Sequence, residues 1–310
     1  MRLGVLDVGS NTVHLIVVDA HPGARPVPTA SHKSVLRLMR YLEPDGRISE
    51  EGVVAIIGAI SSAMDVARRE GIEELLPMAT SALREARNGE EVLARIDAET
   101  GVTLGVLTGQ DEGRLTFLAI RRWYGWSSGN ILLFDIGGGS LEIAAGSDEY
   151  PEVAVSLPLG AGRTTVQFFP NDPPTPEQML ELRAHSRAVM RADALPLFEH
   201  LPPFQHVVGS SKTIRSLARL AGSTRPNASG TGEATVTLRR ADLKDWIPRL
   251  GQIPAEARQA LPGITPDRTF QIVAGAVVLH SVMKLYDVEE LEVSPWALRE
   301  GILLRYLDAL

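Results

Sequence analysis

The chain of 310 residues has no cysteine, which excludes disulfide bonds, thiolate metal ligands and cysteine nucleophiles. It also has no apolar run that reaches the length of about 18 residues needed to span a bilayer. The first apolar run contains Asp7 and is not followed by a small-residue cleavage site, so we interpret it as a strand and not as a signal peptide. We therefore expect a cytoplasmic protein with no membrane contact.

Charge of one sign does not dominate the sequence. The 31 Lys and Arg residues stand against 38 Asp and Glu residues, which gives a formal net charge of −7. This balance argues against broad nucleic-acid binding but allows a local basic pocket that holds an anion. A hydrophobic share of 44% and a charged share of 22% are typical of folded soluble proteins, and the length corresponds to about two domains.

Strand-like and helical segments alternate along the chain, which predicts an α/β architecture. Apolar and β-branched runs predict strands at residues 3–6 and 13–18, and a helical spacing of apolar residues covers 49–70. Further strands are expected at 75–79, 102–107, 131–134, 141–145, 207–208 and 291–293, and further helices at 90–100, from 108 onward, and at 214–220, 271–285 and 296–310.

A loop-like segment at 123–130 lies near the middle of the chain and predicts two domains, 1–126 and 127–310. The last helix, at about 297–310, is expected to pack back on the first domain. Residues 222–235 are rich in Gly, Ser, Thr and Pro, a composition that predicts a mobile loop.

The most informative feature is a repeated eight-residue pattern. Residues 7–14 read DVGSNTVH and residues 135–142 read DIGGGSLE, which aligns Asp7 with Asp135 and Thr12 with Ser140. Each copy follows one apolar strand and precedes another, so each is predicted to be a β-hairpin. Glycine-rich turns let backbone N–H groups approach a phosphate, and the adjacent carboxylate suits a divalent cation bound through water.

Ordinary hairpins also have glycine-rich turns, and the occurrence of two copies is what favours a phosphate site. A third small-residue loop, 209–213, follows a strand and precedes a helix, so its N–H groups could also face an anion. Taken alone, this loop is equally typical of a helix N-cap turn.

Five segments distributed along the chain are similar to the exopolyphosphatase/guanosine pentaphosphate phosphohydrolase (Ppx/GppA) family of actin-like proteins: 5–12, 79–84, 109–114, 135–142 and 297–301. The resemblance implies two actin-like, ribonuclease H-like domains with a cleft between them. It also implies Mg²⁺, or alternatively Mn²⁺, and hydrolytic release of terminal phosphate from inorganic polyphosphate or from guanosine pentaphosphate. Longer family members continue into helical domains, so the resemblance implies a preference for short chains here, and a homodimer.

Carried over by position, the resemblance assigns Glu112 as the general base that activates the attacking water. It implies a metal site at Asp7, Asp135 and Glu142. The implied phosphate-binding residues are Gly9, Ser10, Asn11, Thr12, Arg84, Gly137, Gly138, Gly139, Ser140, Ser211, Lys212 and Thr213. Other interpretations stay open at this point: Asp111 and Glu112 could merely complement a helix dipole, and Arg84 could be a solvated surface residue.

Several basic residues are candidates for a track along an extended polyanion, although each could equally be surface charge: Lys33, Arg37, Arg163, Lys212, Arg215 and Arg268. His14 and Trp296 are interpreted as packing residues. The leading hypothesis is an exopolyphosphatase. The alternatives are a guanosine pentaphosphate phosphohydrolase, an ATP-driven kinase or chaperone-like ATPase, and a sensor that binds nucleotide or polyphosphate without turnover.

Overall fold

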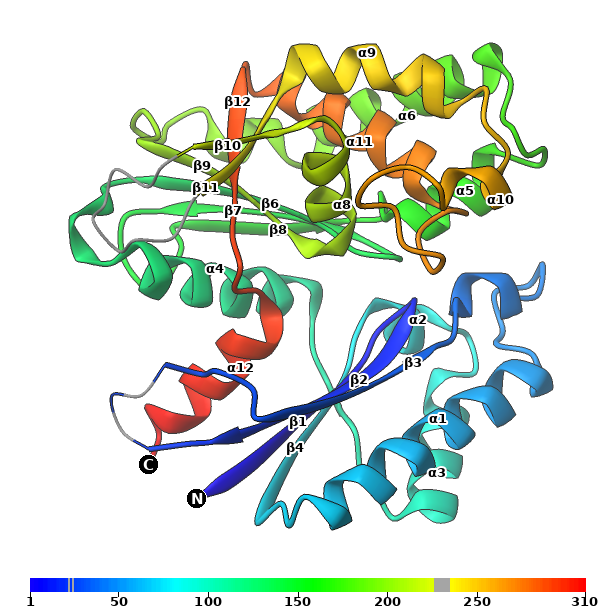
Figure 1. Ribbon diagram of the computed structural model, residues 1–310, viewed down its shortest axis with the longest axis vertical. Helices are drawn as coiled ribbons and strands as arrows, with labels where there is room; N and C mark the ends of the chain where they lie inside the picture. Colours follow the sequence, from blue (N-terminus) through cyan, green and yellow to red (C-terminus); the bar gives the residue numbers. More distant parts are fainter. Residues whose placement is uncertain (22, 24, 226–234) are drawn as a thin grey trace.

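The computed structural model describes residues 1–21, 23, 25–225 and 235–310. Figure 1 shows two lobes, each built around one β-sheet. We call them the first lobe, with the sheet within residues 2–106, and the second lobe, with the sheet within residues 131–293. No helix within the described ranges combines the length and the apolar character that crossing a bilayer requires.

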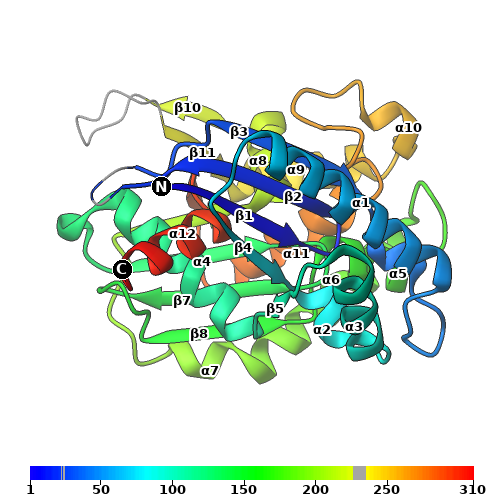
Figure 2. The ribbon, with the colours of Figure 1, turned by 90° about the horizontal axis from the view of Figure 1, so that it is seen from below.

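The first lobe has a five-stranded sheet in the order β3-β2-β1-β4-β5, and Figure 2 shows β3, β2, β1 and β4 side by side in that order. Its elements are β1 (Arg2–Val8), β2 (Thr12–Asp19), β3 (Ala30–Val35), the 3₁₀ helix η1 (Leu38–Tyr41), α1 (Glu50–Arg69), β4 (Glu74–Ala79), α2 (Ser81–Glu85), α3 (Gly89–Thr100) and β5 (Gly105–Val106).

Alternation along β1 explains how this sheet buries both of its faces. Leu6 and Val8 pack into the same cluster as Ile56 of α1, whereas Leu3 and Val5 point to the opposite face. Successive strand residues face opposite sides, so a near-continuous apolar run is the sequence of a strand covered on both faces. Helix α1 begins where the Ser49 side chain accepts a hydrogen bond from the backbone of Gly52, as expected of an N-cap.

The second lobe has a seven-stranded sheet in the order β10-β11-β12-β9-β6-β7-β8. Its elements are η2 (Trp126–Ser128), β6 (Ile131–Ile136), β7 (Leu141–Gly146), β8 (Val153–Leu157), α5 (Ala161–Phe168), α6 (Pro176–Asp193), α7 (Leu195–Phe198), β9 (His206–Ser210), α8 (Ser211–Ala221), β10 (Ser223–Arg225), β11 (Thr235–Arg239), α9 (Arg240–Leu250), α10 (Ala255–Arg258), α11 (Ile272–Leu285) and β12 (Glu290–Val293).

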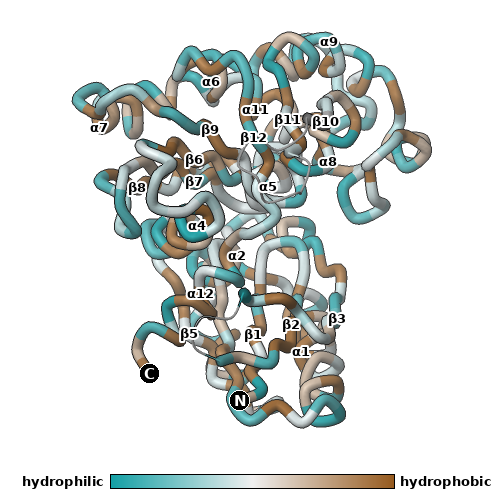
Figure 3. Tube along the Cα trace, turned by 60° about the vertical axis from the view of Figure 1, so that its left-hand side comes forward, coloured by the Kyte–Doolittle hydropathy of each residue, from teal (hydrophilic) through white to brown (hydrophobic). Residues whose placement is uncertain are grey.

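Both sheets repeat one arrangement. In each, a hairpin pairs antiparallel with a third strand, and the first strand of the hairpin pairs parallel with a later one: β1 with β4, and β6 with β9. Helix α11 is apolar on nearly all sides and is buried behind the second sheet, as expected of a helix enclosed by others. Figure 3 shows hydrophobic residues along β1 and β6 and many hydrophilic ones on the outer helices α6 and α9.

Two helices lie between the sheets: α4 (Gly109–Tyr124) and α12 (Leu298–Leu307) (Figure 1). Phe117 and Ile120 of α4 pack on the second sheet, whereas Ile302 of α12 packs in the cluster of β1. The two helices cross at Gly301, where an added Cβ would lie 1.9 Å from the carbonyl oxygen of Leu115. The division into domains 1–126 and 127–310 stays a prediction.

Some expected elements differ in extent. The strand expected at 102–107 is reduced to β5, because this edge strand pairs with β4 at only two positions. The terminal helix begins at Leu298 and not at 296, since the Ser294 side chain accepts a hydrogen bond from the backbone of Trp296 and holds a turn there. In the loop expected at 222–235, Ser223–Arg225 forms β10 and Thr235 begins β11, while 226–234 lie outside the described residues.

Candidate active site

The two predicted hairpins face each other across the junction of the lobes. A Cβ added to Gly138 would lie 2.9 Å from Cβ of Ser10, and one added to Gly139 would lie 2.4 Å from Oγ of Ser81. Real Cβ atoms do not approach other atoms so closely, so the second hairpin needs glycine at these two positions in order to approach the first lobe. The repeated motif therefore brings both turns to one place.

In both turns the carbonyl groups are held by neighbouring segments. The carbonyls of Ser10 and Asn11 accept hydrogen bonds from the backbone of residues 36–38, and those of Gly137, Gly138 and Gly139 accept from residues 160–163 at the start of α5. Each turn is also closed by an equivalent bond, from Gly9 N to Thr12 O at 3.0 Å and from Gly137 N to Ser140 O at 2.9 Å.

The N–H groups of these turns remain available as donors. Within the part of the chain that the structure describes, no acceptor is assigned to the backbone N–H of Ser10, Asn11, Gly138, Gly139 or Ser140. Backbone N–H groups that converge without acceptors form a cradle for oxygen anions. Both turns therefore have the local structure that the sequence predicted for phosphate binding.

A cavity of about 280 Å³ lies between the two hairpins. Predicted site residues among its lining are Asp7, Gly9, Ser10, Asn11, Thr12, Glu112, Asp135, Gly137, Gly138, Ser140, Glu142, Ser211 and Lys212. Three predicted phosphate ligands are not among the lining residues: Arg84, Gly139 and Thr213. Thr213 is fully buried at the start of α8, and its hydroxyl has no partner among the described residues.

Four acidic side chains line the cavity: Asp7, Glu112, Asp135 and Glu142. Asp135 pairs across the hairpin with Glu142, and the two accept hydrogen bonds from Ser210 at 2.6 Å and from Ser156 at 2.8 Å, respectively. Burial raises the pKa of Asp7 and of Asp135 above the ordinary aspartate value. Burial, together with the nearby charge of Glu112, raises the pKa of Glu142 well above its usual value.

Glu112 lies at the first turn of α4, which begins where the Thr108 side chain accepts from the backbone of Asp111. The guanidinium of Arg84 donates to the Glu112 carboxylate and, at 2.7 Å, to the carbonyl oxygen of Leu107. Burial raises the pKa of Glu112 to about 7 even though the ion pair with Arg84 opposes the shift. A carboxylate with a pKa near neutrality is suited to accept a proton at neutral pH.

Five cationic side chains also line the cavity: Lys33, Lys212, Arg215, Arg268 and Arg299. Lys33 of the first lobe donates to Asp267 of the second at 2.6 Å, and Arg37 donates to the carbonyl of Pro266 at 2.7 Å, so the loop before α11 joins the lobes. Burial and the neighbouring Lys33 lower the pKa of Lys212 to about 8. The lining of the cavity therefore combines carboxylates with cations, and Arg299 lies within 3.7 Å of Asp7.

Other parts of the expected basic track serve different contacts. Arg163 donates to the carbonyl of Gly139 at 2.7 Å and pairs with Glu85, so its guanidinium holds the second hairpin and does not line the cavity. Arg37 is likewise absent from the lining.

The prediction that His14 is a packing residue is wrong. His14 lines the cavity, and the guanidinium of Arg299, which lies 3.7 Å from the Asp7 carboxylate, donates to its Nδ1. Burial and the charge of Arg299 lower the pKa of His14 to about 3, so the imidazole is neutral. Trp296 does pack, edge to face on Trp123 with ring centroids 5.4 Å apart.

The sequence analysis assigned no role in the site to four polar lining residues: Thr80, Ser81, Thr116 and Arg299. Arg299 could have been found from the motif at 297–301, which was noted without a role for the arginine. Thr80 and Ser81 follow β4, which pairs parallel with β1, so they reach the same sheet edge as the first hairpin. No sequence signal marks Thr116.

The carboxylates suit a hydrated divalent cation. Among the described residues, no three His, Asp or Glu side chains come close enough to hold an ion by themselves. Magnesium is typically held by one or two carboxylates together with water and substrate phosphate. The buried pair Asp7 and Asp135, in which the charge of Asp135 adds to burial in raising the pKa of Asp7, fits that mode of binding.

The chain matches known proteins over nearly its whole length. A family model described as the Ppx/GppA phosphatase family matches residues 16–310. The chain is 48% identical over 309 residues to "Exopolyphosphatase 1" of Mycobacterium tuberculosis, and the match covers 100% of this chain and 89% of that protein.

Solved structures show the same fold. The crystal structure of the Ppx/GppA family member from Aquifex aeolicus is 27% identical, with a TM-score of 0.77 over 100% of this chain and 98% of its own. An exopolyphosphatase from Cytophaga hutchinsonii is 24% identical, with a TM-score of 0.86 over 100% and 99%. The predicted fold of two actin-like domains is confirmed.

Proposed function

This chain belongs to the Ppx/GppA phosphatase family, and from that premise we propose that it is an exopolyphosphatase, which releases terminal orthophosphate from inorganic polyphosphate. The observation that carries the proposal is the meeting of two turns with free N–H donors beside a buried glutamate whose pKa is near neutrality. Donors, cations and a base around one cavity are what phosphoanhydride hydrolysis requires.

In the proposed reaction, the terminal phosphate sits between the hairpin of β1 and β2 and the hairpin of β6 and β7. Glu112 accepts a proton from a water molecule while the water oxygen bonds to the terminal phosphorus. The bond from that phosphorus to the bridging oxygen breaks, and the shortened chain leaves with the electron pair. Arg84 holds the Glu112 carboxylate in place, which makes Arg84 a positioning residue.

The charge that develops on the phosphoryl oxygens is stabilised from two sides. The N–H groups of the turns donate to these oxygens, and Lys33, Lys212 and Arg268 attract the remainder of the chain. A divalent ion held through Asp7 and Asp135 would supply further neutralisation of the terminal phosphate oxygens.

Several features of the cavity favour polyphosphate over a nucleotide. Ile136, Ala297 and Leu298 are the only apolar side chains among its described lining residues, so it offers little apolar surface against which a guanine base could pack. The contacts of Lys33 and Arg37 with the loop before α11 also close part of the cleft between the lobes. We therefore propose that short polyphosphate chains are preferred, with guanosine pentaphosphate as the alternative substrate.

The experiment compares Glu112→Gln with Asp111→Asn, its neighbour on α4, whose exposed carboxylate contacts only Thr108 and Arg114 among the described residues. Phosphate release from polyphosphates of several lengths and from guanosine pentaphosphate is measured with Mg²⁺ and with Mn²⁺. Glu112→Gln is expected to lower kcat about 10²- to 10⁴-fold, the usual contribution of a general base, and Asp111→Asn to change it little.

Undiminished hydrolysis by Glu112→Gln would remove this residue from the mechanism. Faster turnover of guanosine pentaphosphate than of every polyphosphate would replace the proposed substrate. Equal kcat/KM for short and very long chains would contradict the preference for short ones.

A further inference from the structure

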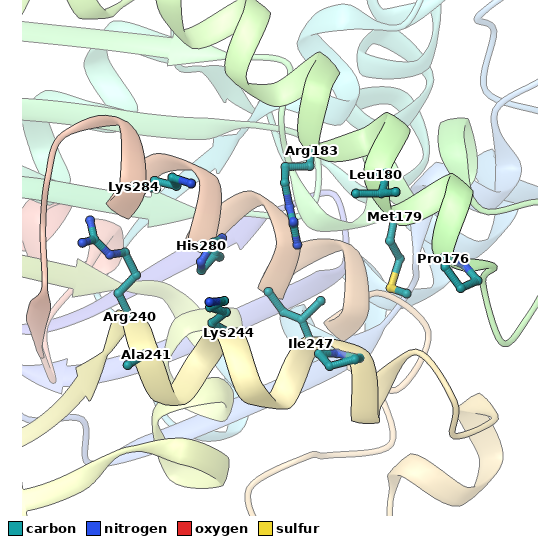
Figure 4. Close-up of a pocket in the computed structure, with 11 residues that line it drawn as sticks. Pro176, Met179, Leu180, Arg183, Arg240, Ala241, Lys244, Ile247, His280 and Lys284 are labelled. Atoms are coloured by element: carbon teal, nitrogen blue, oxygen red, sulfur yellow. The ribbon is translucent and has the colours of Figure 1, made fainter.

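A second and larger cavity, of about 630 Å³, lies in the second lobe between α6, α9 and α11 (Figure 4). It shares no lining residue with the cleft between the hairpins. Nothing in the proposed hydrolysis uses it. Its lining therefore needs an explanation of its own.

Arg240, Lys244 and Lys284 lie toward one end of this second cavity, and Arg183 lies between them and the apolar residues (Figure 4). Arg183 comes from α6, Arg240 and Lys244 come from α9, and Lys284 comes from α11 (Figure 4). None of the lining side chains is acidic. Cations that face one another without acidic partners repel each other, so their convergence requires a compensating anion or solvent.

Local ion pairs do not neutralise this group. Arg240 lies 3.4 Å from the carboxylate of Asp287, but that side chain is 95% exposed, so the pair is well screened by solvent. For Arg183, Lys244 and Lys284 the described residues provide no acidic partner, and Nε of Arg183 is buried without a hydrogen bond. Within the described part of the chain, three of the four cations therefore have no carboxylate partner.

A buried, uncharged histidine lies beside these cations. His280 of α11 is 6% exposed, and its Nδ1 has no hydrogen-bonding partner among the described residues. Burial and the surrounding cations lower the pKa of His280 to about 4, so the imidazole is neutral at neutral pH. A neutral imidazole still has one N–H group that can donate to a phosphate oxygen.

The other end of the cavity is apolar. Pro176, Met179 and Leu180 of α6 and Ile247 of α9 lie there, away from Arg240 and Lys284 (Figure 4). Ligand sites commonly combine an apolar surface with a few polar groups that fix orientation. An occupant that satisfies both ends has a multiply charged anionic group joined to a compact apolar group.

We propose that the second cavity is a binding site for a nucleoside di- or triphosphate, with the phosphates among the four cations and His280 and the base against the apolar end. Methionine and aliphatic side chains provide a surface that packs well on a planar ring. Inorganic polyphosphate shares the phosphate chemistry but offers nothing to the apolar end. The proposed site contains no residue of the cleft, so a test of it does not depend on whether the proposed hydrolysis is correct.

The distribution of lysine makes a direct test feasible. The chain has four lysines: Lys33 and Lys212 line the cleft, whereas Lys244 and Lys284 line the second cavity. Acetylation of each lysine by acetic anhydride can be followed by mass spectrometry in the Glu112→Gln chain, which is chosen to suppress turnover. The probes are adenosine 5′-(β,γ-imido)triphosphate, inorganic triphosphate and adenosine.

The imidotriphosphate is expected to slow acetylation of Lys244 and Lys284 severalfold. Inorganic triphosphate should protect Lys33 and Lys212 and leave the second pair largely reactive, and adenosine should protect neither pair. Protection by the imidotriphosphate at Lys33 and Lys212 alone would overturn the proposal, because binding would then occur in the cleft only. Equal protection of Lys244 and Lys284 by inorganic triphosphate would overturn the role given to the apolar end.

A charge reversal provides the second measurement. Lys244→Glu places a carboxylate in the second cavity, and Arg249→Glu makes the same change on α9 outside the lining, where Arg249 lies over Trp246. By calorimetry, Lys244→Glu should weaken imidotriphosphate binding at least tenfold, while Arg249→Glu preserves it. Both exposed changes should leave phosphate release from polyphosphate intact. Equal affinity in the two variants would contradict the proposal.

Discussion

The two hairpins have the same backbone arrangement but differ in the residue that pairs with the aspartate across the strands. In the first lobe Asp7 pairs across the strands with His14, which accepts a hydrogen bond from Arg299. In the second lobe Asp135 pairs in the same register with Glu142, which contacts only hydroxyl donors among the described residues. Duplication therefore supplies the phosphate cradle twice, whereas the charged groups are divided between the lobes.

A second difference concerns the tips of the turns. Ser10 and Asn11 in the first copy correspond to Gly138 and Gly139 in the second. The lobes meet at these tips, so only one of the two hairpins can have side chains there. The loss of side chains in the second copy is what allows the closure of the site.

Among the changes that compare the two hairpins, filling the space between the tips is expected to reduce phosphate release most. Gly138→Ala adds a Cβ that would lie 2.9 Å from Cβ of Ser10, which forces the hairpins apart. Phosphate release should fall about 100-fold, as expected when reacting groups are misplaced by about 1 Å. Adding Ser10→Gly to the same chain removes the clash and should restore part of the activity.

Gly9→Ala is the matched control, because its added Cβ meets no atom closer than 3.5 Å. An equal loss in Gly9→Ala and Gly138→Ala would show that the approach of the two tips is not what limits activity. Failure of Ser10→Gly to restore any activity would have the same meaning.

A smaller loss should follow from removing the acidic partner in the second hairpin. Glu142→Gln keeps the bond from Ser156 but removes one of four carboxylates around the cavity. Steady-state phosphate release should fall about tenfold, at the lower end of the range for groups that orient a metal site or a base. His14→Gln, the equivalent change in the first hairpin, should cost less, since the neutral His14 contributes no charge. The reverse ranking would refute the division of charge between the lobes.

The hairpins were predictable because each is encoded locally. Apolar runs on both sides of an Asp-x-Gly pattern specify two strands and a tight turn, and the structure has both turns within residues 7–14 and 135–142. Helix α4 was also predictable, because Thr108 is typical of an N-cap and Asp111 and Glu112 suit the first turn.

What escaped prediction depends on which distant segments meet. The contact between Arg299 and His14 joins residues 285 positions apart, so the motif at 297–301 does not show that Arg299 meets His14. The pairing of Arg84 with Glu112 also depends on distant segments. The sequence context of Arg84 resembles that of a phosphate ligand, but the fold places the Glu112 carboxylate beside the guanidinium. Strand β8 was also not predicted from the sequence.

The pH dependence of the reaction tests the same difference between the two hairpins. The base must be unprotonated, and burial raises the pKa of Glu112 to about 7, so kcat/KM should reach half of its plateau near pH 7 and level off about one pH unit above. Glu142→Gln removes a like charge that disfavours ionisation of Glu112, and should therefore move this limb to lower pH.

His14→Gln should leave the midpoint of the profile in place, because His14 does not titrate between pH 5 and 9 when its pKa is about 3. Profiles of kcat/KM for the three proteins provide the measurement. A midpoint that follows His14 and not Glu142 would place the controlling charge in the wrong lobe.

The smallest effect concerns the ion pair that joins the lobes. Burial disfavours the charged form of Asp267, but the hydrogen bond from Lys33 and the charges of Arg268 and Lys33 act together against it, and the pKa of Asp267 lies well below its ordinary value. A carboxyl group with a lowered pKa stabilises the folded state above its unfolded pKa of about 3.9, and this stability is lost as pH falls further. Asp267→Asn should therefore lower the unfolding free energy at pH 7 by about 1–2 kcal/mol, between the effects of exposed and of buried pairs.

The difference in melting temperature between Asp267→Asn and the unchanged chain should be roughly 2–8 °C at pH 7 and should shrink as pH falls below about 4. Asp19→Asn removes the carboxylate of an exposed pair with Arg2 inside the first lobe and serves as the control, with a smaller shift expected. Because Lys33 and Asp267 belong to different lobes, a loss larger than that of the control means that the lobes stabilise each other across the cleft. Equal shifts in both variants would mean that each lobe holds its half of the site without help from the other.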